Sequence, residues 1–311
     1  MYKFYSSADM LSLVEYKGLI YEMKKAMMDL ASNEIVVPLR EHIESGKSVF
    51  LFMPVLSEKL KKVAFKYVGV CPENMKINLP SINGFVMIAD LATGIPQAFF
   101  DGATLTALRT GAIGGAAIEI LSSEKAEVLT VFGTGAQAET QIMAAISVRK
   151  IRKIYVCGRD KSKVKSFMEK INSFTDADIS HYKSEENLYE SDIIIAATNS
   201  QKPLFEADLN KFKNDVHINA IGSFRPYMQE IHEVIYEKFN VFIDSKSALV
   251  ESGDLIMPLE SGKVKNENIR ELGKIIGENA DKFNNTKTIF KSVGSAAFDL
   301  YAANYFINKL K

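Results

Sequence analysis

The 311-residue sequence has little of what marks several common classes of protein. Only two cysteines occur, Cys71 and Cys157, and no CxxC spacing is present. A disulfide framework or a thiolate metal site is therefore not expected, and a reducing cytoplasm fits this composition. The 38 basic and 38 acidic residues cancel to a formal net charge of zero. This balance gives no electrostatic reason to expect nucleic acid or an anionic membrane as a partner.

Long apolar runs are also missing. The N-terminal segment MYKFYSSADMLSLVEYK lacks the apolar core of a signal peptide, and no run is long enough to span a bilayer. His232 and Glu233 begin like a zinc-protease motif, but Tyr236 stands where the second histidine ligand belongs. We therefore expect no metal, no membrane partner and a cytoplasmic location.

The first part of the chain shows a helix followed by strands. Apolar residues recur at helical spacing from Ser12 to about Ala31. Short runs rich in Val, Ile and Phe then predict a meander of antiparallel strands: SVFLFMPVLS, VAFKYVGV, INGFVMIAD and GIPQAFF. The next segment, TLTALRTGAIGGAAIEIL, is typical of a helix whose small residues permit close packing.

From Glu127 the pattern changes. Apolar strand-like segments alternate with helical or polar stretches: EVLTVFG, KIYVCG, DIIIAAT, VHINAIG and VFIDS. This order indicates a parallel sheet covered on both faces, and a final helix, SAAFDLYAANYFINKL, is expected to return to the first domain. We predict an α/β fold in which a doubly wound Rossmann domain, residues 120–291, is inserted into a mixed α/β domain made of residues 1–119 and 292–311.

A glycine-rich turn, GTGAQA, follows the first of these strands. In a Rossmann turn the first glycine, here Gly133, permits the tight bend, and the second, Gly135, lets the backbone approach a pyrophosphate. The helix that opens at Ala136 and Gln137 supplies N–H donors and positive potential, and Ala138 lets helix and strand pack closely. The strand before the turn and the helix after it favour a dinucleotide, although a glycine turn without one is the alternative.

The end of the next strand bears on the choice of cofactor. An acidic residue at this place would bind the ribose hydroxyls and select NAD. The strand ends instead in Cys157, Gly158 and Arg159. Gly158 leaves room, and the Arg159 guanidinium can hold a 2′-phosphate with two bonds, which favours NADPH over NADH. The alternatives are that Arg159 is a solvated charge or that Asp160 accepts the ribose.

Taken together, the motifs resemble the ornithine cyclodeaminase/mu-crystallin family. The segments that carry the resemblance follow in order along nearly the whole chain: TLTALRTGAIGGAA, VFGTGAQAETQ, AATNS, INAIGSFRP, FIDSKSALVESGDL and SVGSAAFDLYAA. The resemblance implies a homodimer, a substrate-binding and dimerisation domain built from both chain ends, an inserted NAD(P)-binding domain, and an active site at the domain junction. Members include cyclodeaminases, alanine dehydrogenases and cyclic-imine reductases, so the family leaves the reaction open.

Three basic residues match the family positions that surround the substrate carboxylate: Arg40, Lys66 and Arg109. Arginine can grip a carboxylate with two parallel bonds, and a partly buried lysine can both anchor it and donate a proton. Lys66 is therefore the candidate catalytic residue. Each of the three alone is more often a surface charge or part of a structural ion pair.

Further positions are carried over from the same resemblance. Thr110, Thr198, Asn199 and Gly222 match residues that contact the cofactor. The glycine of SVGSAAFDL, Gly294, would lie near the nicotinamide.

The sequence departs from the cyclodeaminases at one position. Those enzymes carry an aspartate shortly after the glycine that ends NAIG, where it assists proton removal and ring closure. Here the matching position is Phe224, which can pack against a substrate but can move no proton. A register error of one residue would leave Glu230 or Asp244 to serve instead. The NADPH choice points away from cyclodeamination too, because cyclodeaminases recycle their NAD.

We therefore expect an NAD(P)H-dependent reductase of small cyclic α-imino acids, acting on Δ1-pyrroline-2-carboxylate to give L-proline or on the piperideine homologue to give L-pipecolate. Carboxylate clamps would place the C=N bond for hydride transfer. Two alternatives stay open. One is another amino-acid reaction of the family, such as cyclodeamination, alanine-type dehydrogenation or opine-like condensation. The other is an NADPH-dependent binding protein of the crystallin type.

Overall fold

The computed structural model describes residues 2–38, 40–206, 208–276, 283 and 285–309. The chain divides into two compact units, unit 1 with residues 1–109 and 294–311 and unit 2 with residues 110–293. The domain boundaries predicted from the sequence lie at 119/120 and 291/292, and the predicted domains include a few residues that the structure does not describe. The first change falls within one continuous helix, α3 (Gly102–Leu121), so no turn or linker marks it in the sequence.

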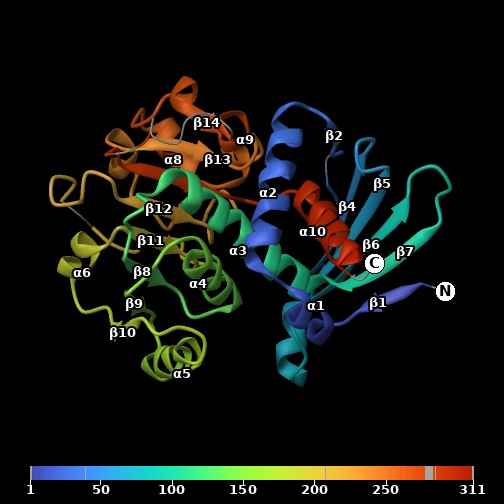
Figure 1. Cartoon of the computed structure of the whole chain (residues 1–311), viewed down its shortest axis with the longest axis horizontal. Helices are drawn as coiled ribbons and strands as arrows, with labels where there is room; N and C mark the ends of the chain where they lie inside the picture. Colours follow the sequence, from blue (N-terminus) through green and yellow to red (C-terminus); the bar gives the residue numbers. More distant parts are fainter. Residues whose placement is uncertain (1, 39, 207, 277–282, 284, 310–311) are drawn as a thin grey trace. The chain divides into compact units, whose positions relative to one another are not determined.

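Unit 1 contains a seven-stranded sheet in the order β1-β7-β6-β5-β4-β2, with β3 paired to β4 (Figure 1). From β4 to β7 neighbouring strands run antiparallel, as the four apolar runs predicted. The strands are β1 (Lys3–Tyr5), β2 (Ile35–Val36), β3 (Glu41–Ser45), β4 (Ser48–Ser57), β5 (Lys62–Val70), β6 (Ile82–Asp90) and β7 (Pro96–Asp101). A 3₁₀ turn, η1 (Pro72–Ile77), joins β5 to β6.

Helices cover one face of this sheet. The C-terminal helix α10 (Ala296–Asn308) packs on α2 (Tyr16–Ala31) and on β4, β5 and β6. The helix predicted from Ser12 to about Ala31 is α2, which begins four residues later than predicted because Ser12 and Leu13 belong to a separate helix, α1 (Ser7–Leu13). At the break the backbone N–H of Glu15 donates to the Tyr305 hydroxyl at 3.0 Å. This contact is with a residue far along the chain, so the local sequence could not predict the break. Leu310, near the end of the predicted last helix, lies outside the described residues.

The opposite face of the sheet carries a row of aromatic rings at intermediate exposure. Tyr67 lies 5.6 Å from Phe85 and 5.8 Å from Phe52 between ring centroids, and Phe85 lies 5.9 Å from Phe99. Because side chains alternate along a strand, these rings point away from α10. We call this surface the aromatic face; its rings are Phe50, Phe52, Phe65, Tyr67, Phe85 and Phe99.

Unit 2 contains an eight-stranded sheet in the order β10-β9-β8-β11-β12-β15-β13-β14, in which every pairing is parallel. The strands are β8 (Val128–Phe132), β9 (Lys153–Cys157), β10 (Asp178–His181), β11 (Ile193–Ala196), β12 (His217–Ala220), β13 (Asn240–Ile243), β14 (Ile269–Glu271) and β15 (Thr288–Lys291). The sequence predicted five of them and missed β10, β14 and β15.

Two separate apolar cores show that helices cover both faces of this sheet. Alternate residues of the fully buried strand β11 enter different cores: Ile193 and Ile195 one, Ile194 and Ala196 the other. The predicted doubly wound Rossmann fold is confirmed. The helices are α4 (Ala136–Val148), α5 (Lys161–Asn172), α6 (Glu185–Glu190), η2 (Glu233–Glu237), α7 (Ala248–Glu251), α8 (Gly253–Glu260), η3 (Asn266–Asn268) and α9 (Leu272–Ile275).

Small residues of α3 let it approach α4 closely, as predicted. A Cβ atom on Gly111 would lie 2.6 Å from the Thr140 carbonyl oxygen, and one on Gly114 would lie 1.9 Å from the Gln141 amide oxygen. Gln141 in turn donates to the Thr110 carbonyl at 2.7 Å. In the described part of the chain, no helix combines the length and the apolar character needed to cross a bilayer.

Candidate active site

The glycine turn lies at the carboxyl end of β8. Gly133 has a φ of +117°, and its N–H donates to the Cys157 carbonyl at 2.8 Å. A Cβ atom at this position would lie 2.4 Å from the Ala197 carbonyl oxygen. Both the backbone conformation and the close approach therefore require glycine.

The second glycine has room around it. Gly135 is the N-cap of α4 and provides no side-chain cap, so the first N–H groups of a 13-residue helix have no side-chain acceptor there. A Cβ atom on Gly135 would meet nothing within 4 Å. The nearby Gln137 amide oxygen is buried without a hydrogen-bond partner. Open space and free helix donors fit a bound pyrophosphate.

The loops after β11 and β12 adjoin this turn. The sheet order places β9 on one side of β8 and β11 on the other, so the chain reverses direction across the sheet at β8 and β11. Ligands of open α/β sheets bind outside the carboxyl ends of strands at such a switch point. Thr198 and the exposed Asn199 follow β11, and Gly222 follows β12. The two loops are in close contact, since a Cβ atom added to Gly222 would lie 1.9 Å from the Thr198 carbonyl oxygen. Three of the predicted cofactor positions thus lie at this edge.

The end of β9 carries the residues predicted to select the cofactor. A Cβ atom on Gly158 would lie 2.8 Å from a Val164 methyl group and 3.1 Å from the Thr134 methyl group, so glycine is needed for packing as well as for space. Arg159 is exposed. Asp160 caps α5 by accepting from the Ser162 and Lys163 N–H groups at 2.9 and 3.2 Å. A hydrogen bond from the Ser162 hydroxyl, together with these two backbone hydrogen bonds, lowers the pKa of Asp160.

A cluster of charged side chains is buried in unit 1. Lys66 of β5 donates from Nζ to the Thr106 hydroxyl at 2.7 Å and to the two Asp299 oxygens at 3.1 and 3.3 Å. Arg109 of α3 donates from Nε to the same carboxylate at 3.1 Å. Lys66 is 5% exposed, Arg109 6% and Asp299 1%. One carboxylate therefore holds two buried cations. We call these three residues the Lys66 cluster.

The Lys66 cluster has a surplus of positive charge. The pKa of Lys66 is lowered to about 8: burial is the main cause, the charges of Arg109 and Arg40 act in the same direction, and Asp299 opposes the shift. Arg40 is exposed but close enough to act on Lys66. Gly294 has a φ of +78°, and a Cβ atom there would lie 2.6 Å from Nη1 of Arg109. An unbalanced buried cationic cluster is suited to receiving an anion such as a carboxylate.

Two of the acidic residues have other roles than the sequence suggested. The sequence reasoning missed Asp299, which lies in a helix of small and apolar residues 233 positions from Lys66. Glu230 and Asp244, the alternatives to a proton-transferring aspartate, are both buried. Asp244 accepts from the Ser292 hydroxyl at 2.7 Å and from the Val293 N–H at 3.1 Å. Phe224 is half exposed, with the Arg225 guanidinium 5.7 Å from its ring centroid.

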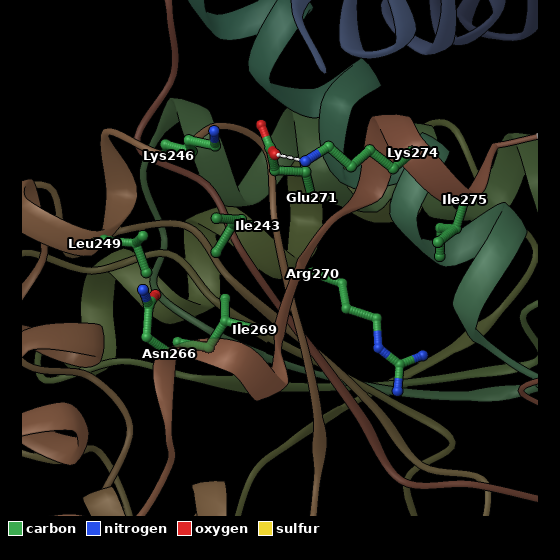
Figure 2. Close-up of a pocket in the computed structure, with 9 residues that line it drawn as sticks. All are labelled: Ile243, Lys246, Leu249, Asn266, Ile269, Arg270, Glu271, Lys274 and Ile275. Atoms are coloured by element: carbon green, nitrogen blue, oxygen red, sulfur yellow. Dashed lines mark ion pairs between the residues drawn. The ribbon is translucent and has the colours of Figure 1, made fainter. Parts of the chain in front are cut away.

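A separate groove of about 510 Å³ lies along β13, β14 and α9 (Figure 2). An ion pair between Glu271 and Lys274, 2.6 Å long, forms part of its wall. None of the predicted site residues lines this groove, so it is distinct from the candidate site. Among the described residues, no group of three or more His, Cys, Asp or Glu side chains could hold a metal ion.

Fold and site define an α/β protein with a Rossmann-type dinucleotide-binding unit and a second unit that holds a buried cationic cluster. The sequence model of the ornithine cyclodeaminase/mu-crystallin family matches residues 6–311, and the chain belongs to this family.

Named relatives indicate the reactions found among similar chains. A Δ(1)-pyrroline-2-carboxylate reductase of Bacillus thuringiensis subsp. konkukian is 36% identical over 98% of this chain and 95% of its own length. The solved Δ(1)-pyrroline-2-carboxylate reductase of Thermococcus litoralis, in complex with NADH and L-proline, superposes with a TM-score of 0.88 at 32% identity, covering 99% of this chain and 97% of that one. A lysine cyclodeaminase has a TM-score of 0.84 at 26% identity, covering 99% and 92%.

Proposed function

We propose that this protein reduces cyclic α-imino acids, with Δ1-pyrroline-2-carboxylate as the first substrate to test and Δ1-piperideine-2-carboxylate as its homologue. The relatives at 36% and 32% identity are reductases of the first compound. Their class, NAD(P)-dependent oxidoreductases acting on C=N bonds, is the class predicted from the sequence. The observation that carries the proposal is the positive surplus of the Lys66 cluster, which a substrate carboxylate would neutralise.

In the proposed reaction the protein places the substrate and manages one proton. Arg109, Lys66 and Arg40 bind the carboxylate beside the C=N bond, and Asp299 fixes Lys66 and Arg109 in the geometry that receives it. A bound reduced nicotinamide supplies the hydride that adds to the imine carbon. The nitrogen of a neutral imine then needs one proton. Lys66, with a pKa lowered to about 8, is the residue that we assign to deliver it.

We propose NADPH as the preferred form of the cofactor. Arg159 is exposed at the end of β9, and Asp160 is occupied as a helix cap, so the cationic side chain is the better placed to meet a 2′-phosphate. The Thermococcus litoralis reductase was solved with NADH. Both nucleotides therefore belong in the test.

Phe224 supports reduction over cyclodeamination. It matches the position at which cyclodeaminases carry an aspartate, and its half-exposed ring offers an apolar surface and no proton. Glu230 and Asp244 cannot readily replace that aspartate because internal donors already occupy their oxygens. We propose that Phe224 packs against the substrate.

We also propose a homodimer in which the aromatic face is covered. Contiguous apolar patches on a protein surface mark contacts with other proteins, and aromatic residues are enriched at such contacts. Sedimentation of wild type beside a Phe85→Glu variant tests this assignment. A dimer in wild type and a monomer in the variant would support it, whereas a wild-type monomer would refute it.

The direct test follows the absorbance of the reduced nicotinamide. Purified protein is mixed with NADPH or NADH and Δ1-pyrroline-2-carboxylate, with the piperideine homologue, pyruvate plus ammonia, and ornithine plus NAD in parallel. Rapid NADPH oxidation with the cyclic imines alone supports the proposal. Proline formed from ornithine would instead establish a cyclodeaminase. Tight NADPH binding with no turnover would establish a binding protein.

A further inference from the structure

Glu230 lies fully buried below the loops that follow β11 and β12. One carboxylate oxygen accepts from the Thr198 N–H at 2.6 Å and from its hydroxyl at 2.7 Å. The other accepts from the N–H groups of Gly222 and Ser223 at 2.6 and 3.0 Å. A single side chain therefore links two loops that are 24 residues apart in sequence, as the numbers of Thr198 and Gly222 show.

These loops are the ones that adjoin the glycine turn. Ala196 and Ala220, the last residues of β11 and β12, are directly paired in the sheet, so the loops leave the same edge side by side. The Thr198 methyl group would lie 3.5 Å from a Cβ atom on Gly133. A ligand on the turn would thus have the β11 loop as its neighbour. Any change in the bond network of Glu230 would be transmitted to that loop.

Charged groups of both signs lie near Glu230. Asp254 of α8 accepts from the N–H groups of Glu230 and Ile231 at 2.7 and 3.0 Å and also from Nζ of Lys291 at 3.1 Å. The pKa of Glu230 is raised to about 7: burial is the main cause, Asp254 acts in the same direction, and Lys291 and the Thr198 hydrogen bonds oppose the shift. Burial raises the pKa of Tyr236, and the nearby carboxylates of Asp254 and Glu230 raise it too. The Glu230 oxygens face internal donors and are buried from solvent.

We infer that Glu230 is a positioning residue for the cofactor, whose carboxylate ties the Thr198 loop to the Gly222 loop and so fixes the edge of the sheet on which the nicotinamide nucleotide binds. This inference rests on the proposed function, because it requires that these loops contact a nicotinamide nucleotide. It assigns Glu230 no contact with the substrate and no proton transfer.

The experiment uses Glu230→Gln, which keeps the size of the side chain but turns one acceptor into a donor. That donor would face either the Thr198 pair or the Gly222 and Ser223 pair, so one loop is released. Titration of NADPH and NADH without substrate is expected to show a rise in Kd of about 10- to 100-fold. At saturating cofactor, kcat should stay within about threefold of wild type, because the reacting groups are untouched.

A matched control exists at the other end of the same sheet. Asp192 at the amino end of β11 accepts from the N–H groups of Glu127 and Val128, both at 2.8 Å, and pairs with Lys213. Asp192→Asn is the same kind of change away from the carboxyl edge: it keeps one oxygen for these two N–H groups, removes the charge and turns an amide donor toward Lys213. It is expected to lower stability and leave both cofactor affinities within about twofold of wild type.

Hydrogen exchange measured without cofactor gives a second readout. Faster exchange of one of the segments 197–199 and 221–224 in Glu230→Gln, and of neither segment in Asp192→Asn, would show directly that the clamp is lost. Unchanged exchange or unchanged Kd in a folded Glu230→Gln would overturn the inference. If Glu230→Gln does not fold, Thr198→Val replaces it, and unchanged loop exchange in that variant would likewise overturn the inference. Wild-type protein that binds neither nucleotide would instead refute the proposed function.

Discussion

Lys66 and Lys291 are both buried lysines that pair with an aspartate at 3.1 Å, one in each unit, yet their surroundings carry opposite charge. Around Lys66 a second buried cation, Arg109, shares the single carboxylate of Asp299. Around Lys291 a second carboxylate, Glu230, joins Asp254. We call the latter three residues the Lys291 cluster.

The two clusters differ in the sign of their net charge, and this difference suits one to a structural role and the other to binding an anion. In the Lys291 cluster the surplus is negative, and backbone N–H groups from the neighbouring loops satisfy it within the protein. In the Lys66 cluster the surplus is positive, and the Asp299 carboxylate is shared between the two cations. A buried charge needs a partner, so the Lys66 cluster is suited to binding an external anion.

The largest effect is expected from removing the lysine of the Lys291 cluster. Lys291→Met leaves Asp254 and Glu230 buried together without the cation that faces them, and we expect the free energy of unfolding to fall by about 3–5 kcal/mol. Lys66→Met leaves Asp299 paired with Arg109, so its cost should be below about 1.5 kcal/mol. Urea unfolding of the two variants measures this difference. Equal losses would erase the distinction between the clusters.

The next effect concerns the open cluster. Arg109→Ala removes one of the cations that we propose to bind the substrate carboxylate, and we expect kcat/KM to fall by about 30- to 1,000-fold, chiefly through a higher KM. Steady-state kinetics with Δ1-pyrroline-2-carboxylate measure this, with Arg152→Ala, which removes a surface ion pair to Glu127, as the control. Kinetics of Arg109→Ala equal to wild type would remove this residue from the site.

The pH dependence of the reaction tests the charge of Lys66. Its pKa is lowered to about 8, so the side chain is cationic below that value and becomes neutral as the pH rises through it. Because kcat/KM reports groups of the free enzyme, it should fall about tenfold per pH unit above pH 8. In Lys66→Arg, which keeps its charge, this limb should be absent. A profile that is the same in both proteins would contradict the assignment.

The smallest effect is expected at the exposed cofactor residue. Arg159→Ala should lower the preference for NADPH over NADH by about fivefold, since exposed ion pairs contribute about 1 kcal/mol or less. The ratio of the two kcat/KM values is the measurement, and Lys161→Ala provides a neighbouring control. An unaltered ratio would show that Arg159 does not bind the 2′-phosphate of NADPH.

Much of the fold follows from local pattern. The apolar runs of unit 1 and the β8, β9, β11, β12 and β13 strands were predictable because each keeps a strand period or a continuous apolar run. Strand β15 was missed because Thr288–Lys291 is short and ends in a lysine, and the Asp254 that makes this burial possible lies 37 positions away. The break between α1 and α2 depends on Tyr305 in the same way.

The site was predictable where geometry alone demands a residue type, and unpredictable where a distant partner decides. The positive φ of Gly133 requires glycine, so the turn could be predicted from the glycine in the sequence. Arg40, Lys66 and Arg109 came from family resemblance. Asp299 escaped notice, and Glu230 was considered only as a substitute for the missing aspartate, because a carboxylate between apolar neighbours gives no local sign of the donors that it meets.

The two glycines of the cofactor turn answer to different constraints. A side chain at Gly133 would strike the Ala197 carbonyl, so substitutions there are lost with the fold. A side chain at Gly135 would meet open space, so a folded protein tolerates it and only a bound pyrophosphate would collide with it. Mutation at the second position therefore offers a one-step evolutionary route from a nucleotide-dependent protein to an intact scaffold that has lost its nucleotide.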